Sequence, residues 1–190
     1  DRFKEEHAEL FRQGGELKAN FIKAEKAIAR SLRDPLFQEY MSGEKQVIMT
    51  GELFGSKWKI KMDSYHPGRA IVDLKYMQSL TKFGYVPDIG YLDFVRYWGY
   101  DLQGAIYQEI VYQNTGKRLP FYIAGISKEE AMNIEVIYIH DNYLKEAMKV
   151  IESRMPRILQ VKYHGAKPDR CEQCIWCRDT KVLTKPIGIG

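Results

Sequence analysis

Two aspartates and a lysine lie close together in a stretch where apolar and polar residues alternate. The alternation predicts two β-strands, at 57–63 and 70–75, joined by a tight turn. Asp73 and Lys75 are two residues apart on the second strand, so their side chains share one face of the sheet. Asp63 falls near the end of the first strand. Carboxylate oxygens are ligands for Mg²⁺ or Mn²⁺, and the stretch therefore predicts a metal-and-water site at the end of a hairpin.

Two further groups of polar residues bear on this site. Glu52 falls in a predicted strand at 47–54, either as a charge at the sheet edge or as a further acid for the metal. Gln103 and Tyr107 are four residues apart in a predicted helix at 100–114. They therefore lie on one face of that helix, where an amide and a phenol point the same way.

All three cysteines of the chain, Cys171, Cys174 and Cys177, are separated by two residues each. An odd cluster this tight does not form a disulfide framework, and it indicates a reducing, cytoplasmic location and a bound metal or cluster. Thiolates bind both zinc and iron–sulfur centres. Three thiolates leave one position open, for which His164 is the nearest candidate in the chain.

The composition is that of a globular protein that binds no membrane. The chain has 190 residues, 45% hydrophobic and 28% charged, and no apolar run approaches the length of a membrane span. The net charge of +4 resides in the segment 145–170, where Arg154 and Arg157 could face phosphate or simply be solvated. Arg96 and Trp98 combine charge with stacking, which suits unpaired bases, although aromatic residues before a helix are often core.

The hydrophobic pattern predicts helices and strands in an order that gives a mixed α/β sheet flanked by helices. We expect two N-terminal helices, the first ending at Gly14–Gly15 and the second spanning about 20–33, and an irregular segment at 76–99. The remaining predictions are strands at 119–126 and 134–139 and a helix at 143–155, which Pro156 bends or ends. One domain follows, with N-terminal helices (1–42), a core (46–160) and a cysteine-containing tail (161–190).

These residues resemble the PD-(D/E)XK nucleases. The match consists of Asp63, then Asp73-Leu74-Lys75, then Gln103 with Tyr107, which looks like the QxxxY motif of the RecB-like branch. The segment 98–107 is similar to the corresponding helix of RecE-like exonucleases, exodeoxyribonuclease VIII among them, and the resemblance covers most of residues 46–140. It is closest to prophage-encoded members that end in a cysteine cluster.

The resemblance implies a restriction-endonuclease-like fold and a metal-dependent DNA nuclease, an exodeoxyribonuclease that acts on linear duplex ends in phage recombination. It implies that the Leu74 backbone carbonyl joins Asp63 and Asp73 as a metal ligand. Gln103 and Tyr107 would position the substrate strand. A phage single-strand annealing protein is the implied partner, and ring-shaped homo-oligomers occur in the family.

Family members also carry an acid or histidine on a helix before the first strand. The candidates here are not distinguished by spacing, and the residue could precede Asp1, where the chain begins without Met; they are Glu5, Glu6, His7, Glu9, Glu25 and Glu39. Resemblance to AddB-type nucleases favours a [4Fe–4S] cluster over zinc, with its fourth cysteine upstream of Asp1. The alternative reading is a non-catalytic nucleic-acid-binding module that has a structural cysteine-bound metal and uses the basic segment 145–170.

Overall fold

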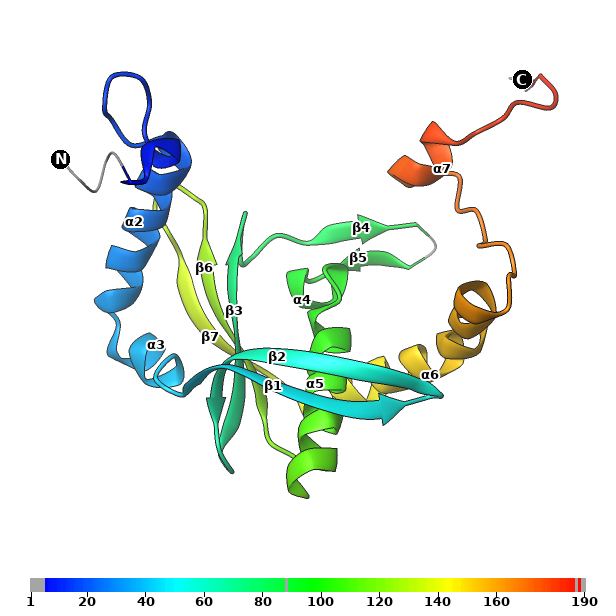
Figure 1. Ribbon diagram of the computed structural model, residues 1–190, viewed down its shortest axis with the longest axis horizontal. Coiled ribbons are helices and arrows are strands. Elements are labelled where there is room, and N and C mark those ends of the chain that lie inside the picture. The colour runs from blue at the N-terminus through cyan, green and yellow to red at the C-terminus, as the bar shows by residue number, and fades with distance from the viewer. Residues whose placement is uncertain (1–5, 88, 187, 189–190) are drawn as a thin grey trace. The chain divides into compact units, whose positions relative to one another are not determined.

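The protein is built on a five-stranded mixed sheet with strand order β1-β2-β3-β6-β7 (Figure 1). The computed structural model describes residues 6–87, 89–186 and 188. Strands β3 and β6 are parallel, and every other neighbouring pair in this sheet is antiparallel. The predicted mixed α/β fold with flanking helices is confirmed. In chain order the elements are η1 (Ala8–Leu10), α2 (Ala19–Leu32), α3 (Pro35–Tyr40), β1 (Glu44–Leu53), β2 (Ser56–His66), β3 (Ala70–Met77), β4 (Gly84–Val86), β5 (Gly90–Leu92), α4 (Phe94–Tyr97), α5 (Tyr100–Thr115), β6 (Phe121–Ser127), β7 (Ile134–Ile139), α6 (Asp141–Tyr163) and α7 (Ile175–Asp179).

The contacts between residues divide the chain into two compact units, Asp1–Ser153 and Arg154–Gly190. The first unit contains the whole sheet, and the second contains the end of α6, the cysteines and α7. No helix in the described part of the chain is both long and apolar enough to cross a bilayer.

The two faces of the sheet are covered by different helices (Figure 1). On one face, Ala27 of α2 and Phe37 of α3 pack against Ala70 and Val72 of β3. Side chains alternate along a strand, so Asp73 faces the opposite side, toward α5. The predicted alternation of β3 therefore places Ala70 and Val72 under α2 and α3 and places Asp73 and Lys75 on the face toward α5.

Strand β2 belongs to the sheet only at its C-terminal end. Its pairing with β3 stops at Ser64 and Val72, and from there back to Ser56 it pairs with β1 alone. The resulting two-stranded ribbon crosses α5 and contacts it (Figure 1). Gln113 of α5 binds both the N–H and the carbonyl of Glu52, at 3.1 and 3.0 Å, and so fixes the ribbon to the helix.

Helix α5 begins and ends at glycines with positive φ, Gly99 and Gly116, as the sequence predicts for its C-terminus. Its apolar residues do not form one buried stripe, because of Leu102, Ile106 and Ile110 only Ile110 is fully buried. The residues buried with it are Gly104, Ala105, Gln108 and Val111. The helix is enclosed by the sheet on one side and by the ribbon on another, so a single stripe does not describe its packing.

Three predicted segments differ from the structure. The helix expected up to Gly14 is, in its described part, a 3₁₀ turn at Ala8–Leu10 followed by a bridge between Phe11 and Leu17. The expected irregular segment at 76–99 contains the β4–β5 hairpin and α4. Helix α6 does not end at Pro156, which lies inside it, and it continues to Tyr163.

Candidate active site

Asp73 is the centre of a small polar network between β3 and α5. Its side chain is buried, with Oδ1 accepting a hydrogen bond from Gln103 Nε2 at 2.7 Å and Oδ2 lying 2.5 Å from Lys75 Nζ. Lys75 Nζ also donates to Gln103 Oε1 at 2.9 Å. Each of the three side chains is therefore held by the other two. The shared face of Asp73 and Lys75, inferred from their spacing, brings them into direct contact.

Asp63 joins this network because β2 and β3 separate next to it. The antiparallel register would place Asp63 opposite Asp73, but the backbone pairing has already stopped. Asp63 Oδ2 accepts instead from the backbone N–H of Leu74 at 2.9 Å, and Oδ1 accepts from Gln46 Nε2 at 2.9 Å. The carboxylate thus replaces a strand carbonyl and stands beside the Asp73–Leu74 peptide.

Burial raises the pKa of Asp73 above its ordinary value, and the negative charge of Asp63 adds to the rise, while Lys75 and Gln103 oppose it. Asp73 Oδ2 has no hydrogen bond beyond its ion pair with Lys75. Two neighbouring carboxylates, one of which has a buried oxygen without a hydrogen bond, form a donor set that fits a hard divalent cation. Asp63, Asp73 and the Leu74 carbonyl are the oxygen donors at this position.

Two tyrosines of α5 complete the surroundings of the network. Tyr107 donates from its hydroxyl to the Lys61 carbonyl at 3.0 Å, and its ring meets Phe121 edge-on. It therefore connects the ribbon to the helix rather than touching Asp73. Tyr100 lies with its ring centroid 4.5 Å from Lys75 Nζ, and burial followed by the charge of Asp73 raises its pKa. The motif spacing does not single out Tyr100, although this residue lies three positions before Gln103 on the same helix.

The comparisons with known proteins identify the family of this chain. A family model described as a PDDEXK-like domain of unknown function (DUF3799) matches residues 1–180. The chain belongs to this family. Its structure is also similar to the crystal structure of a putative exonuclease from Eubacterium rectale, with 63% sequence identity, a TM-score of 0.87, and coverage of 99% of this chain and 71% of that one. No curated protein matches the sequence.

Glu52 does not reach the carboxylates of this PDDEXK-like domain. It lies opposite Lys57 near the tip of the ribbon, whereas Asp63 lies beside Gln46 at the other end. At about 3.3 Å per residue, six residues of strand separate Glu52 from Gln46 by roughly 20 Å. Its role as an edge charge, the other reading of its position, agrees with this placement.

The structure assigns no further acid to the site among the residues it describes. Glu39 is paired with Arg69, Glu9 lies 3.7 Å from His7, and Glu25 is exposed on α2, which packs on the opposite face of the sheet. Glu5 lies outside the described residues. Within the described ranges, no His, Asp or Glu joins Asp63 and Asp73 in a group of three ligand atoms suited to one ion.

The predicted nucleic-acid contacts have separate environments. Arg96 is ion-paired with Asp93, the N-cap of α4, at 2.6 Å, whereas Trp98 is 61% exposed and lines a cavity described below. In the second unit, Arg157 is paired with Asp169 at 2.8 Å, and Arg154 is exposed. Trp98 borders a cavity of about 620 Å³, and Arg96 borders a separate, smaller one of about 190 Å³.

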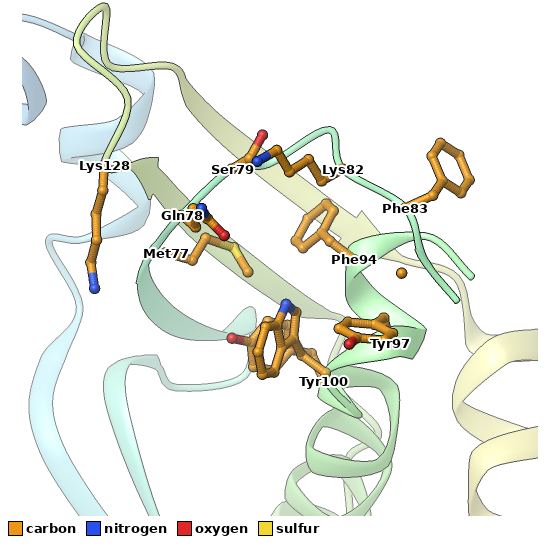
Figure 2. A pocket seen from close by; sticks show the side chains of 11 residues that line it. Met77, Gln78, Ser79, Lys82, Phe83, Phe94, Tyr97, Tyr100 and Lys128 are labelled. Atoms are coloured by element: carbon orange, nitrogen blue, oxygen red, sulfur yellow. The ribbon is translucent and has the colours of Figure 1, made fainter. Parts of the chain in front are cut away.

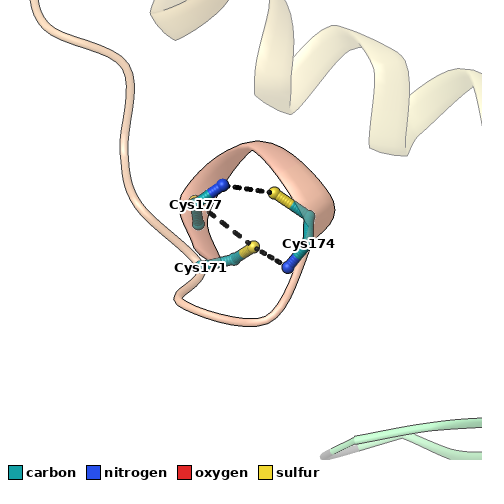
Figure 3. A group of neighbouring side chains, drawn as sticks. All are labelled: Cys171, Cys174 and Cys177. Atoms are coloured by element: carbon teal, nitrogen blue, oxygen red, sulfur yellow. Dashed lines mark hydrogen bonds between the residues drawn. The ribbon is translucent and has the colours of Figure 1, made fainter. Parts of the chain in front are cut away.

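The second unit holds the three cysteines as a compact group (Figure 3). Their sulfurs lie within 4.8 Å of one another, and the Cys171 and Cys177 sulfurs are 3.8 Å apart. Cys174 Sγ accepts from the Cys177 N–H at the start of α7, and Cys171 Sγ accepts from the Cys174 N–H. The expected fourth ligand His164 is not part of this group.

The cysteine group is chemically suited to a metal. The N–H groups of Cys174 and Gln173 lower the pKa of the Cys171 thiol to about 7. This favours the thiolate that metals bind. The sulfur of Cys177 is buried, while Cys171 and Cys174 are exposed. Three thiols with converging sulfurs can bind a metal ion or cluster.

Proposed function

We propose that this protein is a metal-dependent DNA nuclease that hydrolyses phosphodiester bonds. The observation that carries the proposal is the contact of Asp73 with Lys75 and Gln103 at the point where Asp63 meets the Leu74 backbone. This arrangement places oxygen donors and an ammonium group on one face of β3. The PDDEXK-like family and a neighbour named as an exonuclease support the same activity.

In this mechanism Asp63, Asp73 and the Leu74 carbonyl would hold Mg²⁺ or Mn²⁺. When bound, the ion supplies charge neutralisation at the phosphate and lowers the pKa of a coordinated water. Lys75 is fixed by Gln103, so its ammonium group can orient the attacking water or donate to a phosphate oxygen as negative charge develops. Asp73 Oδ2, which pairs with Lys75 alone, is the oxygen with free coordination capacity.

Gln103 and Tyr107 have positioning roles in this proposal. Gln103 forms hydrogen bonds with both Asp73 and Lys75 and so fixes the position of the carboxylate relative to the ammonium group. Tyr107 holds the β2 backbone at Lys61, two residues before Asp63. Because the substrate strand must pass this edge of α5, the same two side chains would fix its position relative to Lys75.

The finer activity we propose is exodeoxyribonuclease action on linear duplex ends in phage recombination. The RecE-like segment 98–107 supports it, as does the name of the structural neighbour. Such an enzyme would supply single strands to an annealing protein and could act as a homo-oligomer.

Digestion of matched DNA substrates tests the proposal. Linear duplex, covalently closed circular duplex and single-stranded DNA of one sequence are incubated with Mg²⁺, with Mn²⁺ or with EDTA. We expect Mg²⁺-dependent loss of linear DNA, no loss of the closed circle, and label release from one type of end only. Cleavage of the closed circle would indicate an endonuclease. Binding with no cleavage of any substrate would favour the non-catalytic binding module.

For the cysteine group we propose a [4Fe–4S] cluster, with zinc as the alternative. The C-x₂-C-x₂-C spacing matches the first three ligands of a ferredoxin-type run, which favours iron–sulfur. The 3.8 Å between two sulfurs is close to the separation that one tetrahedral ion with bonds of about 2.3 Å imposes, which favours zinc. Anaerobic purification followed by visible absorption and metal analysis decides between them: a brown protein with iron and sulfide supports the cluster, and a colourless protein with zinc excludes it.

A further inference from the structure

An open cavity of about 620 Å³ lies between the end of β3, the start of the β4–β5 hairpin and α4 (Figure 2). Phe94, Tyr97 and Tyr100 border it on the side of α4 and α5, and Met77, Gln78 and Ser79 border it on the side of β3. This volume is within the range of about 300–1,000 Å³ typical of cavities that hold a small ligand. All of its lining residues belong to the first unit.

Aromatic side chains dominate the walls of this cavity, and several of them are not needed for the core. Phe94 is buried with Met77 and Leu80 and forms the base. Trp98 and Phe83, by contrast, are 61% and 65% exposed. Water-exposed rings at the border of a cavity provide flat apolar surfaces, which suit the face of a nucleobase.

The position of Tyr97 beside Trp98 is fixed by the backbone of the hairpin. A Cβ atom on Gly84 would lie 2.1 Å from the Tyr97 ring, so the ring occupies the space that any other residue at position 84 would fill. Tyr97 in turn meets Trp98 edge-on, with ring centroids 5.2 Å apart. Trp98 is therefore supported by Tyr97, and its large exposed surface is available to a ligand.

The charge of the cavity is positive. Lys82 and Lys128 line it, and the lining contains no acidic residue. Lys128 Nζ lies 4.9 Å from the centre of the Tyr76 ring, but in the described part of the chain no carboxylate pairs with Lys82, which is exposed. A cation without a protein partner at the rim of an aromatic cavity is suited to a phosphate.

The cavity adjoins the candidate active site at Tyr100. This residue lines the cavity, and its ring centre lies 4.5 Å from Lys75 Nζ, which contacts Asp73. Met77, on the cavity side, is two residues after Lys75 on β3. A strand with one phosphate at Asp73 would thus have a neighbouring nucleotide at the cavity.

We propose that this cavity binds an unpaired nucleotide of the strand being cut, with its base against Trp98 and Phe83 and its phosphate at Lys82. The proposal rests on the nuclease function given above and adds to it a substrate class, DNA ends that carry or can open into single strands. A base inside a duplex is covered on both faces by its neighbours, so blunt paired DNA would not use this cavity.

Binding and fluorescence measurements test this inference without requiring cleavage. The probes are linear duplexes with a blunt end, a 5′ overhang or a 3′ overhang, with 2-aminopurine in the overhang, in buffer without divalent cations. We expect quenching of 2-aminopurine by the wild-type protein with one overhang. Trp98→Ala and Phe83→Ala should each reduce that quenching and weaken overhang binding about tenfold, with blunt-end binding changed less than about twofold. Lys82→Gln should lower the salt dependence of overhang binding by about one ion.

Matched variants outside the cavity provide the controls. Tyr91→Ala removes an exposed aromatic ring from β5 that does not line the cavity, and Lys26→Gln removes an exposed lysine from α2 on the other face of the sheet. Both should bind every probe as the wild type does. Circular dichroism establishes that each variant is folded.

The outcomes separate this inference from the proposed nuclease function. Overhang binding and quenching that are unaltered in both Trp98→Ala and Phe83→Ala would overturn the nucleotide site, even if the protein digests DNA. Trp98-dependent quenching in a protein that cleaves no DNA would support the site and refute the nuclease. Loss of binding in the Tyr91→Ala control equal to that in Trp98→Ala would also overturn the proposal, because the effect would not be specific to the cavity.

Discussion

At the scale of single residues, the site depends on the conflict between burial and charge at Asp73. The carboxylate is 3% exposed, and its burial raises its pKa, yet Lys75 and Gln103 supply an ion pair and a hydrogen bond that favour the ionised form. Asp63 adds negative charge from the neighbouring strand. A cation would relieve the repulsion between the two carboxylates, which is why we place the metal there.

Asp101 offers a prediction on pH and stability that is independent of this site. One of its side-chain oxygens is buried with no hydrogen bond among the described residues, and burial raises its pKa. Because the pKa is higher in the folded state than in the unfolded state, the protonated carboxyl group favours folding at low pH. This contribution to the free energy of unfolding is lost as the pH rises through the folded-state pKa. Asp101→Asn should therefore remove part of the fall in stability between acidic and neutral pH. Urea denaturation of both proteins over that range measures it, and parallel pH profiles would contradict the prediction.

At the scale of secondary structure elements, the site forms where the β2–β3 pairing ends and α5 makes hydrogen bonds to both strands. The pairing stops at Ser64 and Val72, which frees Asp63 to bond the Leu74 N–H. Helix α5 contributes Gln103 to Asp73 and Tyr107 to the ribbon. The three elements thus set the distance between the two carboxylates.

The close approach of α5 to β6 depends on Gly104. A Cβ atom there would lie 2.6 Å from Phe121 and 3.0 Å from Leu144, both of which are buried. Gly104→Val should destabilise the protein by about 1–3 kcal/mol because it overpacks the core. It should also lower nuclease activity, since the shifted helix moves Gln103 from Asp73. Gly14→Val, which meets no atom within 4 Å, is the control and should stay within about 0.5 kcal/mol of the wild type in urea denaturation.

The sequence predicted the sheet and most of the site because their signals are local. Alternation along β3 places Asp73 and Lys75 on one face, and helical spacing places Gln103 and Tyr107 together. The end of the β2–β3 pairing and the separation of Glu52 from Asp63 depend on contacts between elements distant in the chain, which no local pattern encodes. The N-terminal prediction was wrong because Phe11 and Leu17 form a bridge that helical spacing does not reveal.

At the scale of the whole molecule, the chain divides the two candidate metal sites between its two units. The carboxylates belong to Asp1–Ser153 and the cysteines to Arg154–Gly190. The second unit has few buried apolar residues, with Cys177 among them. Ion pairs such as Arg157 with Asp169 are exposed and contribute little. A cysteine-bound metal is therefore the interaction best able to order this unit.

Cys177→Ser tests this role of the cysteine group. The variant should lose most of its bound zinc or iron, because one of three converging sulfurs is replaced by a hydroxyl. It should also be cleaved faster by a protease between residues 164 and 186. Ile175→Ala, in the same helix but 81% exposed, is the control and should retain the metal. Full metal content in Cys177→Ser would contradict the assignment.

The most direct test of the account is the rate of Mg²⁺-dependent degradation of linear duplex DNA by Asp73→Asn and Lys75→Met. Each variant should lower the rate by about 10²–10⁴-fold. DNA binding should be retained, because neither change alters Trp98, Lys82 or the basic segment 145–170. Lys26→Met, on the opposite face of the sheet, should degrade DNA at the wild-type rate. Undiminished degradation by both Asp73→Asn and Lys75→Met would show that these residues do not form the active site.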